Sequence, residues 1–150
     1  MTAFGVTGLQ DLGLYELAEL RLSGSHQDRI LAANINWLAG KHCGGTADVR
    51  GDVHLNYLLP GAVAGNHYHL RVFEYFVNLG PVDLELQLRH SETGETAIVV
   101  MPPPSRSRMP VFRPKHKVAH AVLNRADCAA VLLIIVDADQ PEDVKAMRSA

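Results

Sequence analysis

Residues 66–75 read NHYHLRVFEY, two histidines one residue apart followed by a glutamate. On an extended strand, residues i and i+2 point to the same face, so His67 and His69 project side by side. Their backbones lie about 6–7 Å apart, which lets two imidazoles bind one ion. Glu74 follows His69 by an odd number of residues and cannot share that face on one continuous strand. A turn at residues 70–73 removes the conflict, because Glu74 then begins the neighbouring strand and faces the histidines across the ladder.

A second segment, KVAHAVLN at residues 117–124, offers a third histidine. Alternation along this predicted strand places four residues on one face: Val118, His120, Val122 and Asn124. Two predicted strands and a loop separate His120 from His69, as expected for a partner on an adjacent antiparallel strand. Imidazole nitrogen and carboxylate oxygen suit Fe(II), Mn, Ni or Zn, and leave positions open for water or substrate.

From residue 52 onward the chain is patterned as short strands. Alternation and apolar runs predict strands at residues 52–59, 81–90, 96–101, 117–124 and 128–137. Residues 91–95 predict a hairpin turn, and the proline-rich residues 102–110 predict a loop that no central strand would contain. The first forty residues fit neither the helical nor the strand period. Polar residues 137–150 predict a tail that closes with a short helix near Pro141.

Length and composition favour one cytoplasmic domain. A chain of 150 residues with 47% apolar and 20% charged residues is typical of a single globular domain. The net charge of −2 argues against a nucleic-acid partner. The longest apolar run, residues 128–136, is too short to cross a membrane, and the N-terminal residues do not resemble a secretion signal. Cys43 and Cys128 are expected to be free buried thiols of a reducing compartment, the alternative being a disulfide between them.

Residues 61–80, GAVAGNHYHLRVFEYFVNLG, are similar to the first motif of the cupin superfamily. The positions that match the family spacing are Gly61, His67, His69 and Glu74, whereas Gly80 comes one residue early. The run GNHYH is also similar to the cupin domains of bacterial capsule and nucleotide-sugar biosynthesis enzymes.

Residues 114–124, PKHKVAHAVLN, are similar to the second cupin motif, in which His120 and Asn124 fit. The segment before His120 is one residue longer than usual and contains His116. The resemblance implies an all-β, cupin-type antiparallel β-barrel (jelly roll), commonly dimeric. It implies one divalent metal in the lumen, held by His67, His69, Glu74 and His120. Residues 1–150 are then one cupin domain with its barrel core at about residues 45–138, an N-terminal extension and a short C-terminal tail or helix.

Three residues are candidates for moving a proton in such a site: His116, Tyr57 and His54. The sequence leaves open whether Tyr57 or the alternate pair His54 and Asn56 faces inward. Parity with Glu74 points Phe76 and Asn78 into the lumen, where they would contact a substrate. Asn124 is a further candidate for substrate contact, and its alternative role is a hydrogen bond at the barrel end.

The charge distribution favours an anionic ligand. No acidic residue occurs between Glu95 and Asp127, whereas six basic residues fall there: Arg106, Arg108, Arg113, Lys115, Lys117 and Arg125. Grouped cations favour phosphate or carboxylate groups, which makes Arg113 and Lys115 candidates for substrate binding. The alternative is a solvated loop balanced by the acidic C-terminal segment.

Three functions remain open at this point. The first is a metal-dependent isomerase, epimerase or dehydratase acting on a small polar, sugar-like and anionic metabolite. The second is an Fe(II)-dependent dioxygenase with the same ligands. The third is a non-catalytic module that binds a sugar or a small acid. In each case we expect a small-molecule partner and a homodimer, with no nucleic acid and no membrane partner.

Overall fold

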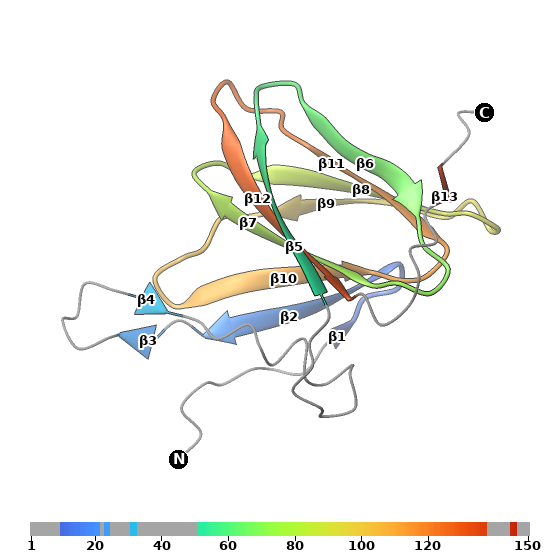
Figure 1. Cartoon of the computed structure of the whole chain (residues 1–150), viewed down its shortest axis with the longest axis horizontal. Coiled ribbons are helices and arrows are strands. Elements are labelled where there is room, and N and C mark those ends of the chain that lie inside the picture. Colours follow the sequence, from blue (N-terminus) through green and yellow to red (C-terminus); the bar gives the residue numbers. More distant parts are fainter. Residues whose placement is uncertain (1–9, 22, 25–30, 33–50, 138–144, 147–150) are drawn as a thin grey trace, which may run out of the picture.

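The computed structural model describes residues 10–21, 23–24, 31–32, 51–137 and 145–146. Over these residues the chain is all-β and forms two antiparallel sheets that face each other, with a separate two-stranded ribbon (Figure 1). Among them there is no helix with the length and apolar character needed to span a bilayer.

The first sheet has six strands in the order β1-β2-β10-β7-β12-β5. These strands are β1 (Gln10–Asp11), β2 (Tyr15–Arg21), β10 (Arg108–Pro114), β7 (Glu74–Gly80), β12 (Ala130–Asp137) and β5 (Gly51–Leu58). The second sheet has five strands in the order β13-β6-β11-β8-β9. These are β13 (Lys145–Ala146), β6 (Val63–Tyr68), β11 (Val118–Leu123), β8 (Leu84–His90) and β9 (Thr96–Met101). The ribbon pairs β3 (Ser23–Gly24) with β4 (Leu31–Ala32).

The space between the two sheets is the main hydrophobic core. The side chains of Leu84, Leu86 and Leu88 on β8 are almost completely buried there, as the alternation along residues 81–90 predicts. Burying a leucine of this kind stabilises the fold by about 1.5–3 kcal/mol. From β5 to β12 the chain passes repeatedly from one sheet to the other, so strands distant in sequence become neighbours (Figure 1).

The strands predicted from alternation are confirmed, with shifts at their ends, and β2 is a strand within the region that was not assigned. One prediction is wrong: residues 108–110, expected to be loop, begin the interior strand β10. This strand tolerates Pro110 and Pro114 because its full ladder is formed with β2, while it pairs with β7 only at Phe112. A proline lacks the N–H that a second complete ladder would require.

The C-terminal prediction is also wrong where it can be compared. Lys145 and Ala146 pair as the short strand β13 with β6, and do not form part of a helix. The rest of that tail lies outside the described residues. Residues 25–30 and 33–50, which include Cys43, lie outside them as well. Pairing with β6 satisfies backbone groups at that strand's open edge, which a helix would leave exposed.

Candidate metal centre

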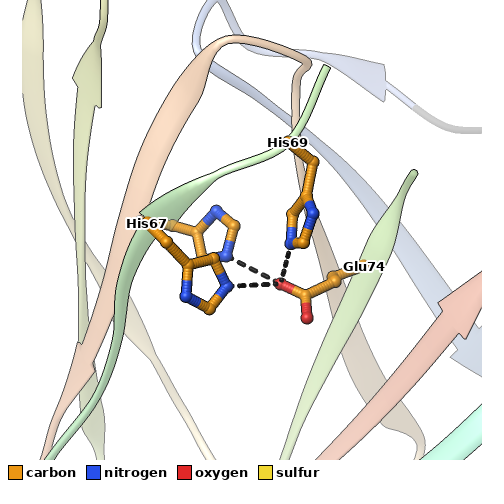
Figure 2. Close-up of side chains that lie close together, drawn as sticks. His67, His69 and Glu74 are labelled. Atoms are coloured by element: carbon orange, nitrogen blue, oxygen red, sulfur yellow. Dashed lines mark ion pairs between the residues drawn. The ribbon is translucent and has the colours of Figure 1, made fainter. Parts of the chain in front are cut away.

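Four side chains from both sheets converge in the interior. His67 lies on β6, His69 follows that strand directly, Glu74 opens β7 and His120 lies on β11. The Nε2 atoms of His120, His69 and His67 lie 2.7, 3.2 and 3.6 Å from the same carboxylate oxygen, Oε2 of Glu74. Figure 2 shows His67 and His69 projecting toward Glu74 from a different segment of the chain. One ligand atom from each residue lies within 4.8 Å of the others, a spacing that can hold one metal ion.

The strand register explains how His120 joins the pair. Strands β6 and β11 are antiparallel neighbours, and His120 lies directly opposite His67. The predicted placement of His120 on an adjacent antiparallel strand is therefore confirmed. Its role as a metal ligand stays a prediction.

The placement of Glu74 was predicted only in part. The chain does turn at residues 70–73, because β6 ends at Tyr68 and β7 begins at Glu74. However, β7 belongs to the other sheet, so Glu74 faces the histidines across the interior and not across a ladder. Parity along one strand cannot distinguish these two arrangements, because both begin a new strand at Glu74.

The donor set fits a divalent metal. Nε2 of His67, Nε2 of His120 and Oε2 of Glu74 are buried and, within the described residues, face only one another and His69. Burial would raise the pKa of Glu74, but the contacts with His120, His67 and His69 together outweigh it and hold that pKa well below its usual range. Glu74 is therefore an anion near neutral pH. Three imidazoles and a carboxylate are ligands that Fe(II), Mn, Ni and Zn accept.

A cavity of about 120 Å³ adjoins three of the four side chains, those of His67, Glu74 and His120. Its walls include Asn56, Ala64, Gly65, Phe76, Val122, Leu132 and Ile134, together with His67, Glu74 and His120. The apolar wall residues Phe76, Val122 and Leu132 are buried, whereas Asn56 and Gly65 are accessible to solvent. Solvent therefore reaches parts of the cavity wall on β5 and β6, which carry Asn56 and Gly65.

The parity of β5 separates the proton-transfer candidates. Asn56 lines the cavity and Leu58 packs in the core, so His54 shares their row by parity, but its side chain is exposed and does not line the cavity. Tyr57 projects from the opposite face with its side chain 69% exposed, so its position gives the predicted catalytic role no support. Alternation alone did not settle this choice, because the apolar row with Tyr57 is the one that faces outward here, whereas the row with Asn56 faces the cavity.

His116 lies in the turn between β10 and β11 and stacks on Phe73, with ring centroids 4.0 Å apart. It does not line the cavity, so its position gives the predicted proton transfer no support. In the same turn, the backbone N–H of Lys117 donates to the carbonyl of His69 at 2.8 Å. This turn therefore holds the backbone of His69, a candidate ligand, in place from outside the cavity.

Of the two residues predicted to point inward beside Glu74, only Phe76 reaches the site. Phe76 lines the cavity, and its ring centroid lies 5.2 Å from that of His120. Asn78 is 1% exposed and its amide is fully used by the backbone. Its Nδ2 donates to the carbonyls of Val82 and Met101 at 2.8 and 2.7 Å, and its Oδ1 accepts from the N–H of Gly80 at 2.8 Å. Asn78 therefore holds a turn, and this arrangement gives its predicted substrate contact no support.

The side-chain amide of Asn124 likewise forms hydrogen bonds with backbone groups. Its Nδ2 donates to the carbonyls of Leu58 and Cys128 at 2.9 and 2.8 Å, and its Oδ1 accepts from the N–H of Ala126 at 3.0 Å. The amide ties the end of β11 to β5 and to the segment before β12. Its alternative role, a hydrogen bond at the barrel end, is the one that the structure shows.

Replacing Asn78 with Ala should lower the free energy of unfolding by about 2–4 kcal/mol, because it leaves buried carbonyl and N–H groups without partners. Urea denaturation measures this change. The matched control is Gln87→Ala, which removes a single hydrogen bond to Glu85 on the outer face and should leave the midpoint nearly unchanged. An Asn78→Ala protein with wild-type stability but weaker ligand binding would restore the substrate-contact role.

Five of the six basic residues between Glu95 and Asp127 are paired with acidic residues elsewhere in the chain. The pairs are Arg108–Glu19, Arg113–Glu16, Lys115–Asp11, Lys117–Glu92 and Arg125–Glu85. Arg113 is buried, its guanidinium carbon lies 4.1 Å from the Phe73 ring centroid, and Nη1 donates to the Tyr75 hydroxyl at 3.2 Å. Neither Arg113 nor Lys115 lines the cavity, so their positions give the predicted binding of a substrate anion no support. Their partners, Glu16 and Asp11, lie about 100 residues away in sequence, which is why the sequence did not reveal them.

Two residues that shape the site were not predicted from the sequence. Gly65 and Asn66 have positive φ angles of 90° and 78° and form a bulge in β6 opposite His120 and Ala121. A Gly-Asn pair inside an alternating strand is the available signal, since both residue types tolerate the left-handed region.

Comparisons with known proteins show the fold. No family model matches the chain, and no curated protein matches it. Among solved structures, the capsular polysaccharide assembling protein CapF from Staphylococcus aureus is 23% identical, with a TM-score of 0.57 over 67% of this chain and 27% of that chain. The chain spans 27–35% of the CapF chains that it matches.

Two further structures match over most of both chains. A 3,4-ketoisomerase from Helicobacter canadensis is 11% identical, with a TM-score of 0.61 over 85% of each chain. The dTDP-6-deoxy-D-glucose-3,5-epimerase RmlC from Legionella pneumophila is 11% identical, with a TM-score of 0.61 over 89% of this chain and 71% of that chain. The predicted cupin-type jelly roll is confirmed, and at these identities the likeness concerns the fold alone.

Proposed function

We propose that this chain is a metal-dependent enzyme that catalyses a non-redox isomerisation, epimerisation or dehydration of a small sugar-like metabolite. The observation that carries the proposal is the convergence of three imidazoles and one carboxylate beside a small cavity. Support also comes from matched structures that are sugar isomerases and epimerases. The basic residues do not favour an anionic substrate, because Arg113 is paired with Glu16 and Lys115 with Asp11.

The cavity limits what the site encloses. Its volume of about 120 Å³ is smaller than the roughly 300–1,000 Å³ of pockets that surround a whole ligand. It therefore encloses only the reacting part of a substrate, while the remainder lies outside between β5 and β6. A bound divalent ion would supply Lewis-acid stabilisation of the negative charge that develops on a substrate oxygen when a neighbouring carbon loses a proton.

The residues around the cavity have separate tasks in this proposal. The side chains of Phe76, Leu132 and Ile134 exclude water from the inner end. The amide of Asn56, at the accessible side, hydrogen-bonds substrate hydroxyl or carbonyl groups. His54 lies outside the cavity but on the same row of β5 as Asn56, opposite Ile134 and exposed to solvent, and we propose that it moves the proton at the accessible side.

The test is exchange of substrate protons with solvent deuterium, followed by NMR. The panel consists of 4-keto-6-deoxy sugars, free and linked to dTDP, added to protein loaded with Zn²⁺, Mn²⁺ or Ni²⁺. We expect exchange at a carbon next to the carbonyl. Oxygen uptake that needs both Fe(II) and substrate, without exchange, would instead indicate a dioxygenase. Binding with neither reaction would indicate a non-catalytic module.

Replacing His54 with Ala should slow this exchange about 10²–10⁴-fold, the usual contribution of general acid–base catalysis, without changing metal affinity. The matched comparison is His116→Ala, which removes the other histidine considered for this step and should leave the exchange rate close to wild type. Slow exchange in His116→Ala together with normal exchange in His54→Ala would overturn the assignment.

We also propose that the chain forms a homodimer through β5. The outward-facing row Val53, Leu55, Tyr57 and Leu59 is 59–69% exposed at the edge of the six-stranded sheet. Exposed apolar rows on edge strands favour association. Light scattering should give the mass of two chains for the wild type and of one chain for Leu55→Lys. Ile98→Lys, on the exposed face of edge strand β9, is the control and should stay dimeric; a monomeric wild type would contradict the proposal.

A further inference from the structure

Along β6, the alternation of inward-facing and outward-facing residues is interrupted in the middle of the strand. Ala64 faces the interior, Gly65 and Asn66 are both exposed, and His67 is again turned inward. In an uninterrupted strand that begins with Ala64 inward, Asn66 would face inward and His67 outward. His69 would also face outward, because it shares the parity of His67. Simple alternation through this sequence therefore directs both histidines away from Glu74.

The pairing with β11 shows where the alternation is interrupted. Ala64 lies opposite Val122 and Gly65 opposite Ala121, but the next residue of β11, His120, lies opposite His67. Asn66 is therefore the extra residue of a β-bulge. A bulge of this kind leaves one residue unpaired and redirects the side chains that follow it.

The backbone of the bulge limits which residues it accepts. Gly65 and Asn66 both occupy the left-handed region, with φ of 90° and 78°. Asn adopts this region more readily than most residues, whereas a β-branched residue there is a clear outlier. A valine at position 66 would favour the uninterrupted strand in place of the bulge.

Gly65 has a second constraint, which is its distance from the strand that carries His120. A Cβ at position 65 would lie 2.8 Å from the backbone oxygen of His120 and 3.6 Å from the Cδ2 atom of its ring. A backbone atom within a strand ladder can move aside only at a large cost in free energy. Any side chain at position 65 therefore pushes β6 away from β11 at the point where His67 and His120 face each other.

We infer that the Gly65–Asn66 bulge is the positioning element of the metal centre: it turns His67 and His69 into the interior, and Gly65 sets their distance from His120. Neither residue supplies a ligand atom. The inference rests on the proposed metal centre, and it adds which residues outside the ligand set determine metal affinity and geometry.

The test is Co²⁺ titration of the metal-free protein, with the visible absorption spectrum as a reporter of coordination geometry. Gly65→Ala and Asn66→Val should each weaken Co²⁺ binding about 10- to 100-fold, the effect typical of residues that orient ligands, and should change the spectrum. Asn66→Gly keeps access to the left-handed region and should retain wild-type affinity and spectrum.

Gly94→Ala is the matched structural control. Gly94 also has a positive φ, of 74°, but it lies in the β8–β9 turn and a Cβ there would meet nothing within 4 Å. It should lose stability from the same backbone strain while binding Co²⁺ as the wild type does. If Gly65→Ala does not fold, the comparison of Asn66→Val with Asn66→Gly decides the question.

The possible outcomes distinguish the two proposals. Wild-type protein that binds no Co²⁺ would overturn the metal centre itself. Wild-type protein that binds Co²⁺ with the same affinity and spectrum as the folded Gly65→Ala and Asn66→Val proteins would overturn only the role of the bulge. Because the readout is metal binding, a failure to find the substrate does not affect it.

Discussion

A protein in which both His67 and His120 are replaced with Ala is expected to bind Zn²⁺ about 1,000-fold more weakly than wild type, or worse. The two imidazoles lie directly opposite each other on β6 and β11 and supply two of the four convergent ligand atoms. A four-ligand protein zinc site is worth roughly 10–16 kcal/mol, so removing half of the ligands removes several kcal/mol. Isothermal titration with Zn²⁺ and elemental analysis of protein purified without chelator measure the loss.

The control for this experiment is His90→Ala. The Nδ1 atom of His90 accepts hydrogen bonds from the N–H groups of Glu92 and Thr93 in the β8–β9 turn, and His90 does not line the cavity. This variant should bind Zn²⁺ as tightly as wild type. Equal Zn²⁺ affinity in the wild type and the double variant would show that the metal binds elsewhere on the chain.

The second large effect is expected at Arg113. Replacing Arg113 with Ala should lower the free energy of unfolding by about 3–5 kcal/mol, because it leaves the partly buried Glu16 carboxylate without its counter-charge. It also removes the guanidinium that lies over the Phe73 ring, next to Glu74. Chemical denaturation of the metal-free protein measures the change.

Lys115→Ala is the matched comparison, because it breaks an exposed pair with Asp11 in the same region. Exposed ion pairs contribute little, so its denaturation midpoint should stay close to wild type. Combining Arg113→Leu with Glu16→Leu should recover part of the stability that Arg113→Ala loses, since no buried charge then remains unpaired. An Arg113→Ala protein with unchanged stability but a raised KM would restore the substrate-binding role that the sequence suggested.

Residues 66–75 show how far sequence reasoning reaches. The odd separation of His69 and Glu74 required a turn, and the turn exists. The inference that His67 and His69 share a face is also correct, because both follow the bulge. The alternation of side chains along a strand depends only on the stereochemistry of each residue and its nearest neighbours. It can therefore be predicted from the sequence.

Where that reasoning failed, the missing information was a partner distant in sequence. Arg113 was interpreted as an anion ligand because Glu16 is 97 residues away. Asn78 was interpreted as a substrate contact because the carbonyl of Met101, to which it donates, belongs to another strand. Polar side chains have no preferred partner in sequence, and only the packed structure shows which one satisfies them.

The sequence by itself determined the all-β class, the positions of most strands and the four residues of the candidate metal centre. Only the tertiary structure decided that Glu74 faces its partners from the opposite sheet, and that a bulge at Gly65 and Asn66 turns His67 and His69 inward. The physical reason is that strand periodicity is local, whereas sheet membership and register depend on pairing between segments far apart in the chain.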